Sequence, residues 1–213
     1  MAQIKDEIVI LKSINFSEAD KILTVYGRTY GKFSILAKGI RKLTSKNRGN
    51  LQTASIAKVS FYRGSGMGVL TESELLCMPD FTLIKLKNIE RVLRLTNKVI
   101  QEDQTDTKTY EALKSVIMNG FSQDAVNRYR IFLLSSNGFL PDWRMCSKCS
   151  RNNTEFKPEY FNKESFEVYC QECYNNYIKA NKSTNNSKTI IVSIENNKSL
   201  ITKILDNYIK EYI

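Results

Sequence analysis

Histidine is absent from this 213-residue sequence, which also holds only three prolines and one tryptophan. Without histidine, Ser-His-Asp and Cys-His catalysis and every His-ligated metal site are excluded. No apolar run approaches the roughly eighteen residues that a membrane-spanning helix needs, so we expect no membrane span. The N-terminal residues lack the apolar block and the cleavage site of a signal peptide. We therefore expect a cytoplasmic protein.

Acidic residues are missing from one long stretch of the chain. Between Asp20 and Glu72 there is no Asp or Glu. If the 22 acidic residues were spread evenly along the chain, about five of them would lie in this stretch. The stretch holds ten cations, which are Lys21, Arg28, Lys32, Lys38, Arg41, Lys42, Lys46, Arg48, Lys58 and Arg63. The whole chain has a net charge of +10, and a field of one sign attracts polyanions. Nucleic acid is the first candidate partner and an anionic membrane surface is the second.

The first eighty residues show the pattern of β-strands. Short apolar runs or alternating apolar and polar residues occupy 8–11, 21–26, 32–38, 57–62 and 69–76. Glycines separate several of these segments, as they do at turns. Five short strands in this length fit a small antiparallel barrel such as the OB-fold, which binds oligonucleotides on one face and its loops. The sequence predicts an OB-fold nucleic-acid-binding domain over residues 1–80.

The densest positive charge lies between the third and fourth predicted strands. Residues 38–48 carry five cations, and 39–53 show no strand pattern. Such a segment is either an ordinary solvated loop or a surface for a polyanion, and the missing acids favour the second. Phe33 and Phe61 are expected in the barrel core, whereas Tyr62 is a candidate for stacking on bases. The candidate nucleic-acid-binding residues are Lys32, Lys38, Arg41, Lys42, Lys46, Arg48, Tyr62 and Arg63.

From residue 81 onward the apolar residues recur at helical spacing. Amphipathic segments cover about 86–100, 109–118, 122–137 and 199–212. The predicted fold class is therefore α+β, with the five-stranded barrel followed by an α-helical domain over residues 81–213. A zinc-binding insertion is expected within that domain at about residues 144–176.

Four cysteines in that insertion have the spacing of a metal site. Cys146 and Cys149 form one CxxC pair, and Cys170 and Cys173 form a second pair twenty residues later. This pattern is typical of one structural Zn²⁺ held by four thiolates, which leaves no open position for catalysis. An iron–sulfur cluster and two disulfides are the alternatives, and a reducing cytoplasm disfavours the disulfides. The fifth cysteine, Cys77, is expected to be a small buried side chain.

Several short motifs follow one another along the chain. They are Glu7-Ile-Val-Ile-Leu-Lys12, Glu18-Ala-Asp-Lys-Ile-Leu-Thr24, Gly31-Lys32, Ala37-Lys38-Gly39-Ile-Arg41-Lys42, Tyr62-Arg63-Gly64 and Asn137-Gly-Phe-Leu-Pro141, the last followed by Cys146 and Cys149. In their order and spacing they resemble the RecO family of bacterial recombination mediators. The resemblance covers roughly residues 1–175.

The resemblance implies a protein that binds single- and double-stranded DNA and anneals complementary strands. With RecR it would help to load RecA onto DNA coated by single-strand-binding protein, whose C-terminal tail the helical domain would contact. Motif match makes Lys38, Arg41 and Lys42 the DNA-contacting positions. No catalytic residue is evident, so we expect a non-enzymatic, nucleoid-associated protein. The alternative is a zinc-containing OB-fold protein that binds RNA in translation or RNA annealing.

Overall fold

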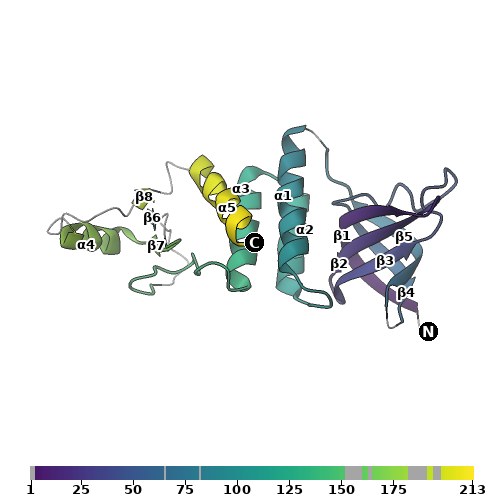
Figure 1. The fold of residues 1–213 in the computed structure, drawn as a ribbon, viewed down its shortest axis with the longest axis horizontal. Helices are drawn as coiled ribbons and strands as arrows, with labels where there is room; N and C mark the ends of the chain where they lie inside the picture. The colour runs from purple at the N-terminus through teal and green to yellow at the C-terminus, as the bar shows by residue number, and fades with distance from the viewer. Residues whose placement is uncertain are drawn as a thin grey trace. The chain divides into compact units, whose positions relative to one another are not determined.

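The computed structural model describes residues 3–64, 66–81, 83–151, 160–162, 165–181, 191–193 and 198–213. The chain forms two compact units, Met1–Tyr129 and Arg130–Ile213. The first unit holds a β-barrel followed by helices, and the second holds helices and a small sheet (Figure 1). Within the described ranges, no helix is both long and apolar enough to cross a membrane.

Five strands of the first unit close into a barrel. They are β1 (Gln3–Phe16), β2 (Asp20–Gly27), β3 (Gly31–Ala37), β4 (Ile56–Tyr62) and β5 (Gly68–Cys77). The strands are hydrogen-bonded in the order β1-β2-β3-β5-β4, and β4 pairs with β1 to close the ring. The β3–β5 pairing is parallel and the others are antiparallel. The predicted five-stranded OB-fold barrel is confirmed (Figure 1).

The first strand contacts both of its neighbours in turn. Residues 3–9 of β1 pair with β4, and residues 8–16 pair with β2. The register shifts between Ile10 and Lys12, where a bulge bends the strand and increases its twist. Because of this bend, a single 14-residue strand spans the two sides of the ring.

Alternate residues of the strands fill the barrel. The core includes Ile8, Ile10, Leu23, Val25, Phe33, Ile35, Val59 and Phe61. The rings of Phe33 and Phe61 stack with their centroids 5.1 Å apart, so both aromatic residues lie in the core as predicted. Cys77, by contrast, is only partly buried at the end of β5, so the expectation of a buried side chain is wrong.

Two acidic side chains of β1 hold neighbouring parts of the first unit. The Asp6 carboxylate accepts hydrogen bonds from the backbone N–H groups of Thr29 and Tyr30, both at 3.1 Å, and so fixes the β2–β3 turn. A Cβ atom at Gly27 would collide with this carboxylate, which explains the glycine. The Glu7 carboxylate faces the helices that follow the barrel.

Three helices follow the barrel, which are α1 (Leu83–Val99), α2 (Thr107–Met118) and α3 (Gln123–Ser136). Asp106 caps α2, because its carboxylate accepts hydrogen bonds from the N–H groups of Lys108 and Thr109. The Glu7 carboxylate accepts hydrogen bonds from the Tyr110 hydroxyl at 3.0 Å and the Lys114 ammonium at 2.7 Å. Helix α2 is therefore attached to the outer surface of β1.

The second unit combines two further helices with three very short strands. These elements are β6 (Tyr160–Asn162), β7 (Val168–Tyr169), α4 (Gln171–Asn181), β8 (Ile191–Ser193) and α5 (Lys198–Tyr212). The strand order is β7-β6-β8, a sheet that the sequence did not predict. The buried guanidinium of Arg130 on α3 donates a hydrogen bond to the Asp206 carboxylate on α5 at 2.7 Å. This ion pair joins the two helices.

We expect Glu7→Gln to weaken the attachment of α2 to the barrel and to lower the free energy of unfolding by about 1–2 kcal/mol at neutral pH. Burial raises the pKa of Glu7, but the hydrogen bonds from Lys114 and Tyr110 and the charges of Lys114 and Arg28 lower it further, so the net pKa lies below 4.5. The stabilisation is therefore complete above the unfolded-state pKa and is lost as the pH falls through the folded-state value.

Denaturant unfolding of both proteins between pH 7 and pH 3 measures this effect, and the stability difference should shrink toward the acidic end. Glu90→Gln is the control, because Glu90 forms only a solvent-exposed ion pair with Arg94 on α1. Equal stability of Glu7→Gln and the unmodified protein at pH 7 would contradict the role of Glu7.

Candidate nucleic-acid interface and metal centre

The connection from β3 to β4, residues 38–55, is the basic loop. It has no strand, as predicted, and no helix, and it folds as successive turns. The backbone N–H groups of Lys42, Ser45 and Arg48 donate to the carbonyls of Gly39, Lys42 and Ser45, at 3.1, 3.0 and 3.3 Å. Ile40 and Leu51 are almost fully buried in the barrel core. The loop is therefore fixed at both of its ends.

Polar contacts attach the basic loop to two neighbouring segments. On one side, the N–H of Gly39 donates to the Asp20 carboxylate at 2.7 Å, and the Arg41 guanidinium donates to the carbonyl of Ser17 at 3.0 Å. On the other side, the Ser73 hydroxyl donates to the side-chain oxygen of Asn47 at 2.7 Å, and the side-chain amide of Asn50 donates to the Ser73 carbonyl at 2.9 Å. The loop spans from the β1–β2 turn to β5.

Sequence reasoning did not single out these anchoring residues. Asn is common at turns, which is the only signal that the sequence gives for Asn47 and Asn50. Their partner Ser73 lies on another strand, so the contact becomes visible only once the strands are paired.

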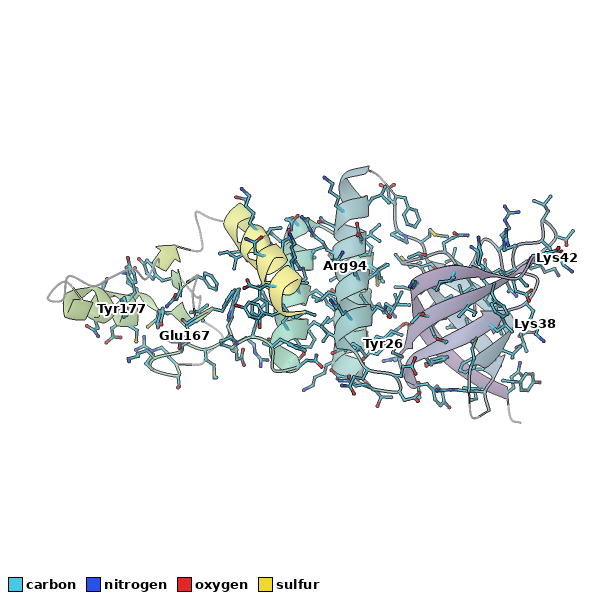
Figure 2. The ribbon with its side chains drawn as sticks, viewed as in Figure 1. Tyr26, Lys38, Lys42, Arg94, Glu167 and Tyr177 are labelled. Carbon is cyan, nitrogen blue, oxygen red and sulfur yellow. The ribbon has the colours of Figure 1, made fainter. Side chains whose placement is uncertain are left out.

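The five cations of the basic loop all have exposed side chains: Lys38, Arg41, Lys42, Lys46 and Arg48. Lys38 and Lys42 extend from the end of the barrel that carries the loop (Figure 2). In the described part of the chain, no ion pair joins any of the five to a carboxylate. The structure therefore brings these candidate residues together with their charges available to an anion.

The other two candidate cations already have partners within the protein. The Lys32 ammonium donates to the backbone carbonyl of Asn97 at 2.8 Å, and burial lowers its pKa. Arg63 forms an ion pair with Asp103 and lies over the Phe33 ring, 5.1 Å from its centroid. The Lys32 ammonium is thus held at the last turn of α1 and the Arg63 guanidinium at the segment after α1, so both charges already have partners within the protein. The Tyr62 ring, which is 40% exposed, remains accessible.

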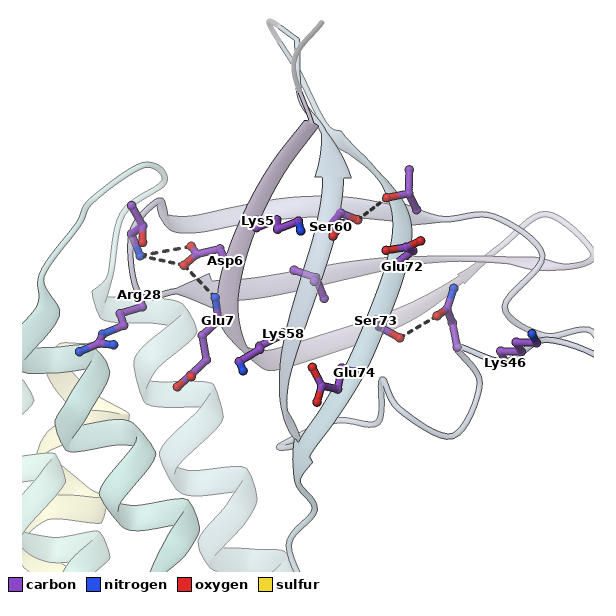
Figure 3. A pocket seen from close by; sticks show the side chains of 14 residues that line it. Lys5, Asp6, Glu7, Arg28, Lys46, Lys58, Ser60, Glu72, Ser73 and Glu74 are labelled. Atoms are coloured by element: carbon purple, nitrogen blue, oxygen red, sulfur yellow. Dashed lines mark hydrogen bonds between the residues drawn. The ribbon is translucent and has the colours of Figure 1, made fainter.

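A groove of about 770 Å³ crosses β1, β4 and β5 (Figure 3). Lys58 lies opposite Glu7 on one neighbouring strand and opposite Glu74 on the other. Glu72 lines the same groove, as does Lys5. Lys46 and Asn47 of the basic loop also line this groove, so its carboxylates lie beside the loop. Carboxylates repel phosphate, so this face has mixed charge, whereas the charged residues of the loop itself are all positive.

The four predicted metal ligands lie together in the second unit. The sulfur atoms of Cys146, Cys149, Cys170 and Cys173 all lie within 4.8 Å of one another. Cys170 follows β7 directly and Cys173 lies in the first turn of α4, so the strand end and the helix start bring this pair into place. The stacked rings of Tyr160 and Tyr174, with centroids 3.6 Å apart, pack beside the cluster.

Without a metal, the surroundings act differently on two of the cysteines. Burial and hydrogen bonds with the other three sulfur atoms raise the pKa of Cys173, whereas Cys146 is favoured as a thiolate. Burial raises the pKa of Cys146, but hydrogen bonds from the backbone N–H groups of Cys149, Cys170 and Lys148 outweigh it and bring the pKa down to about 6. Arg151, which is exposed, has its pKa raised by its hydrogen bond to Glu172 and by the charges of Cys149 and Cys170. Four sulfur ligands at these separations suit a metal ion that is coordinated by protein alone.

The fold and the site define an OB-fold protein with a candidate structural metal centre. Its parts are the OB-fold barrel, a loop whose charged residues are all positive, and a following helical part with four clustered cysteines. Residues 1–78 match the family model described as "Recombination protein O N terminal". The barrel-forming part of the chain is therefore similar to the N-terminal domain of the RecO family.

Relatives in the same family extend the match beyond the barrel. The chain is 27% identical to the DNA repair protein RecO of Dehalococcoides mccartyi, over 95% of this chain and 83% of the relative. It is 25% identical to RecO of Halalkalibacterium halodurans over 79% and 68% of the two chains, and 28% identical to RecO of Oceanobacillus iheyensis over 78% and 66%.

Replacing one cysteine of the cluster tests the metal centre. We expect Cys149→Ser to bind much less metal than the unmodified protein, which should hold about one ion per chain, because four-coordinate sites lose affinity with each ligand removed. Elemental analysis of the purified proteins measures the ratio. Cys77→Ser is the control, since Cys77 lies on β5 outside the cluster. Full metal content in Cys149→Ser would show that the cluster is not the site.

Proposed function

We propose that the protein is a non-enzymatic mediator of DNA repair and recombination, which binds single- and double-stranded DNA and anneals complementary strands. The observation that carries this proposal is the group of five exposed cations on the basic loop, within a sequence stretch that has no acidic residue. Similarity to relatives that are called DNA repair protein RecO supports it.

Annealing requires two physical properties of a protein. Two polyanionic strands must be able to approach each other, and cations that displace condensed counterions reduce their repulsion. The bases must also remain free to pair, so contacts to the sugar-phosphate backbone suit the task better than contacts to base edges. Exposed lysines and arginines at the end of the barrel meet the first requirement without violating the second.

The proposal includes partners that follow from the family resemblance. These are RecR, the C-terminal tail of single-strand-binding protein as a ligand of the helical domain, and RecA, which would be loaded indirectly. The proposed location is the cytoplasm, in association with the nucleoid. No residue of this chain is assigned to any of these protein contacts.

We further propose that the four-cysteine cluster holds one structural Zn²⁺. A tetrahedral ion suits four sulfur atoms that lie within 4.8 Å of one another. Cys146, Cys149, Cys170 and Cys173 would occupy all four positions, so the ion would stabilise the fold and would not activate water. It would connect the segment before β6 to the start of α4.

A strand-annealing assay with matched DNA and RNA oligonucleotides tests the proposed function. We expect the protein to accelerate annealing of complementary DNA without a nucleotide cofactor, and the acceleration to fall as salt rises. Annealing of DNA no faster than in buffer alone would refute the proposal. Faster annealing of RNA than of DNA would favour an RNA-binding role, and strand cleavage dependent on a divalent metal would favour a nuclease.

Removing charge from the basic loop should weaken DNA binding. We expect the triple variant Lys38→Gln/Lys42→Gln/Lys46→Gln to lose about 1 kcal/mol per phosphate contact and to flatten the slope of log K against log salt by about 0.9 per contact. Fluorescence anisotropy with labelled DNA across a salt series measures both quantities. Arg41 is retained, because its guanidinium also holds the Ser17 carbonyl.

The matched control removes three exposed lysines from the helices that follow the barrel, in the variant Lys87→Gln/Lys98→Gln/Lys108→Gln. Both variants have the same net charge, so a general effect of charge would affect them equally. If the two salt slopes were equal, the basic loop would not be the phosphate-binding surface.

A further inference from the structure

The four cysteines of the cluster differ in their access to solvent. Cys146 and Cys170 are buried, at 1% and 8% exposure. Cys173 is partly buried, whereas Cys149 is exposed. A reagent dissolved in water therefore meets the cluster first at the sulfur atom of Cys149. Because metal-bound cysteines are thiolates, and the thiolate is the reactive form of the side chain, a metal-loaded cluster presents a nucleophile to solvent at this position.

The sulfur atom of Cys146 is the partner that Cys149 can reach within its own turn. The turn is closed by a hydrogen bond from the Ser150 N–H to the Cys146 carbonyl at 2.9 Å. All four sulfur atoms of the cluster, this pair included, lie within 4.8 Å of one another. Pairs with this Cys-x-x-Cys spacing commonly cycle between dithiol and disulfide. Such a bond changes only one turn, whereas a bond to Cys170 or Cys173 would join two separate segments.

We propose that the four-cysteine cluster is a redox switch, in which hydrogen peroxide converts Cys149 and Cys146 to a disulfide and the metal ion is released. This inference rests on the proposed structural Zn²⁺ and adds to it a regulation of the same site. Cys170 and Cys173 stay reduced. Two of the four ligands are then lost, and the remaining two thiolates bind a metal ion far more weakly.

The reaction balances with peroxide as the only added reactant. The Cys149 thiolate attacks one peroxide oxygen, the O–O bond breaks, and a sulfenic acid forms while the other oxygen leaves as hydroxide. The Cys146 thiolate then attacks the Cys149 sulfur, so that the S–S bond forms and the S–OH bond breaks to release a second hydroxide. The two sulfur atoms lose two electrons, which peroxide gains, and two protons from the solvent convert both hydroxides to water.

The structural consequences fall within the second unit. The first cysteine pair lies before β6, Cys170 directly follows β7, and Cys173 lies on α4, so loss of the ion releases the segments next to these elements. The barrel core, the basic loop and the contact between Glu7 and Tyr110 all lie in the first unit. Oxidation therefore loosens the cysteine-bearing segments and leaves the DNA-binding surface of the barrel intact.

The only tryptophan of the chain reports the state of these segments. Trp143 lies three residues before Cys146 and is 7% exposed. Its ring N–H donates to the Phe166 carbonyl at 2.8 Å, and its ring packs against Phe161 on β6 with the centroids 4.9 Å apart. Loosening of β6 and of the connection to β7 exposes this ring to water, which shifts its emission to longer wavelength.

Peroxide treatment of the metal-loaded protein tests the inference, with the Cys77→Ser variant used so that all remaining cysteines belong to the cluster. We expect each chain to release about one metal ion and to lose about two thiols. A chromogenic chelator and thiol titration measure these values, and peptide mass spectrometry should find the disulfide between Cys146 and Cys149. The emission of Trp143 should shift in parallel. Dithiothreitol with added Zn²⁺ should restore the thiols, the metal and the emission.

Three controls separate the steps. A strong chelator under reducing conditions should produce the same emission shift without any loss of thiols, because the shift follows from loss of the metal. Brief alkylation of the metal-loaded protein should label Cys149 before Cys146 and Cys170. The affinity for labelled duplex DNA should change less than about twofold after peroxide treatment, because the cations of the basic loop are unaffected.

The outcomes distinguish failure of the switch from failure of the metal centre. Metal that stays bound after peroxide treatment, a disulfide that joins the two cysteine pairs, or oxidation that dithiothreitol and Zn²⁺ do not reverse would each overturn the inference and leave the proposed Zn²⁺ centre standing. If the reduced, unmodified protein held no metal ion, the proposed centre itself would be refuted, and the inference with it.

Discussion

The barrel is closed by one bent strand, and the placement of the site depends on this closure. The first half of β1 pairs with β4 and presents Glu7 to helix α2, where Tyr110 and Lys114 bind it. After the bulge, the second half pairs with β2 and ends at Phe16, beside the turn that contacts the basic loop. A single strand therefore attaches the helices at one end and reaches the turn that holds the basic loop at the other.

Charge on the barrel is separated by how its acidic residues are used. Asp6 binds the backbone of the β2–β3 turn, and Asp20 binds the backbone of the basic loop at Gly39. Glu72 and Glu74 line the groove over β5, which Lys46 of the basic loop also lines. The interaction between exposed charges fades within about 10 Å at 0.1 M salt. The attraction of an anion to the basic loop therefore depends on the charges that lie close to the loop. Those of the loop itself are all positive.

Patterns within single segments were predictable from the sequence, whereas contacts between segments were not. The barrel strands alternate clearly, and the CxxC spacing identified all four clustered cysteines. Strands β6, β7 and β8 have only two or three residues each, too few for alternation to be recognised. Lys32 has the same sequence signal as Lys38, and only the position of Asn97 reveals that its ammonium is already bound.

The surroundings of the cysteine cluster give the proposed metal centre a defined task. The barrel has a large apolar core, whereas the cluster itself is packed mainly by Tyr160, Tyr169 and Tyr174. A packed group of this size offsets little of the entropy of ordering the chain, and in small domains a bound metal supplies the remainder. With the proposed ion bound, metal binding and the ordering of the segments that carry the four cysteines would be one equilibrium. The barrel, with its own core and its own attachment to α2, keeps the basic loop in place independently of the metal.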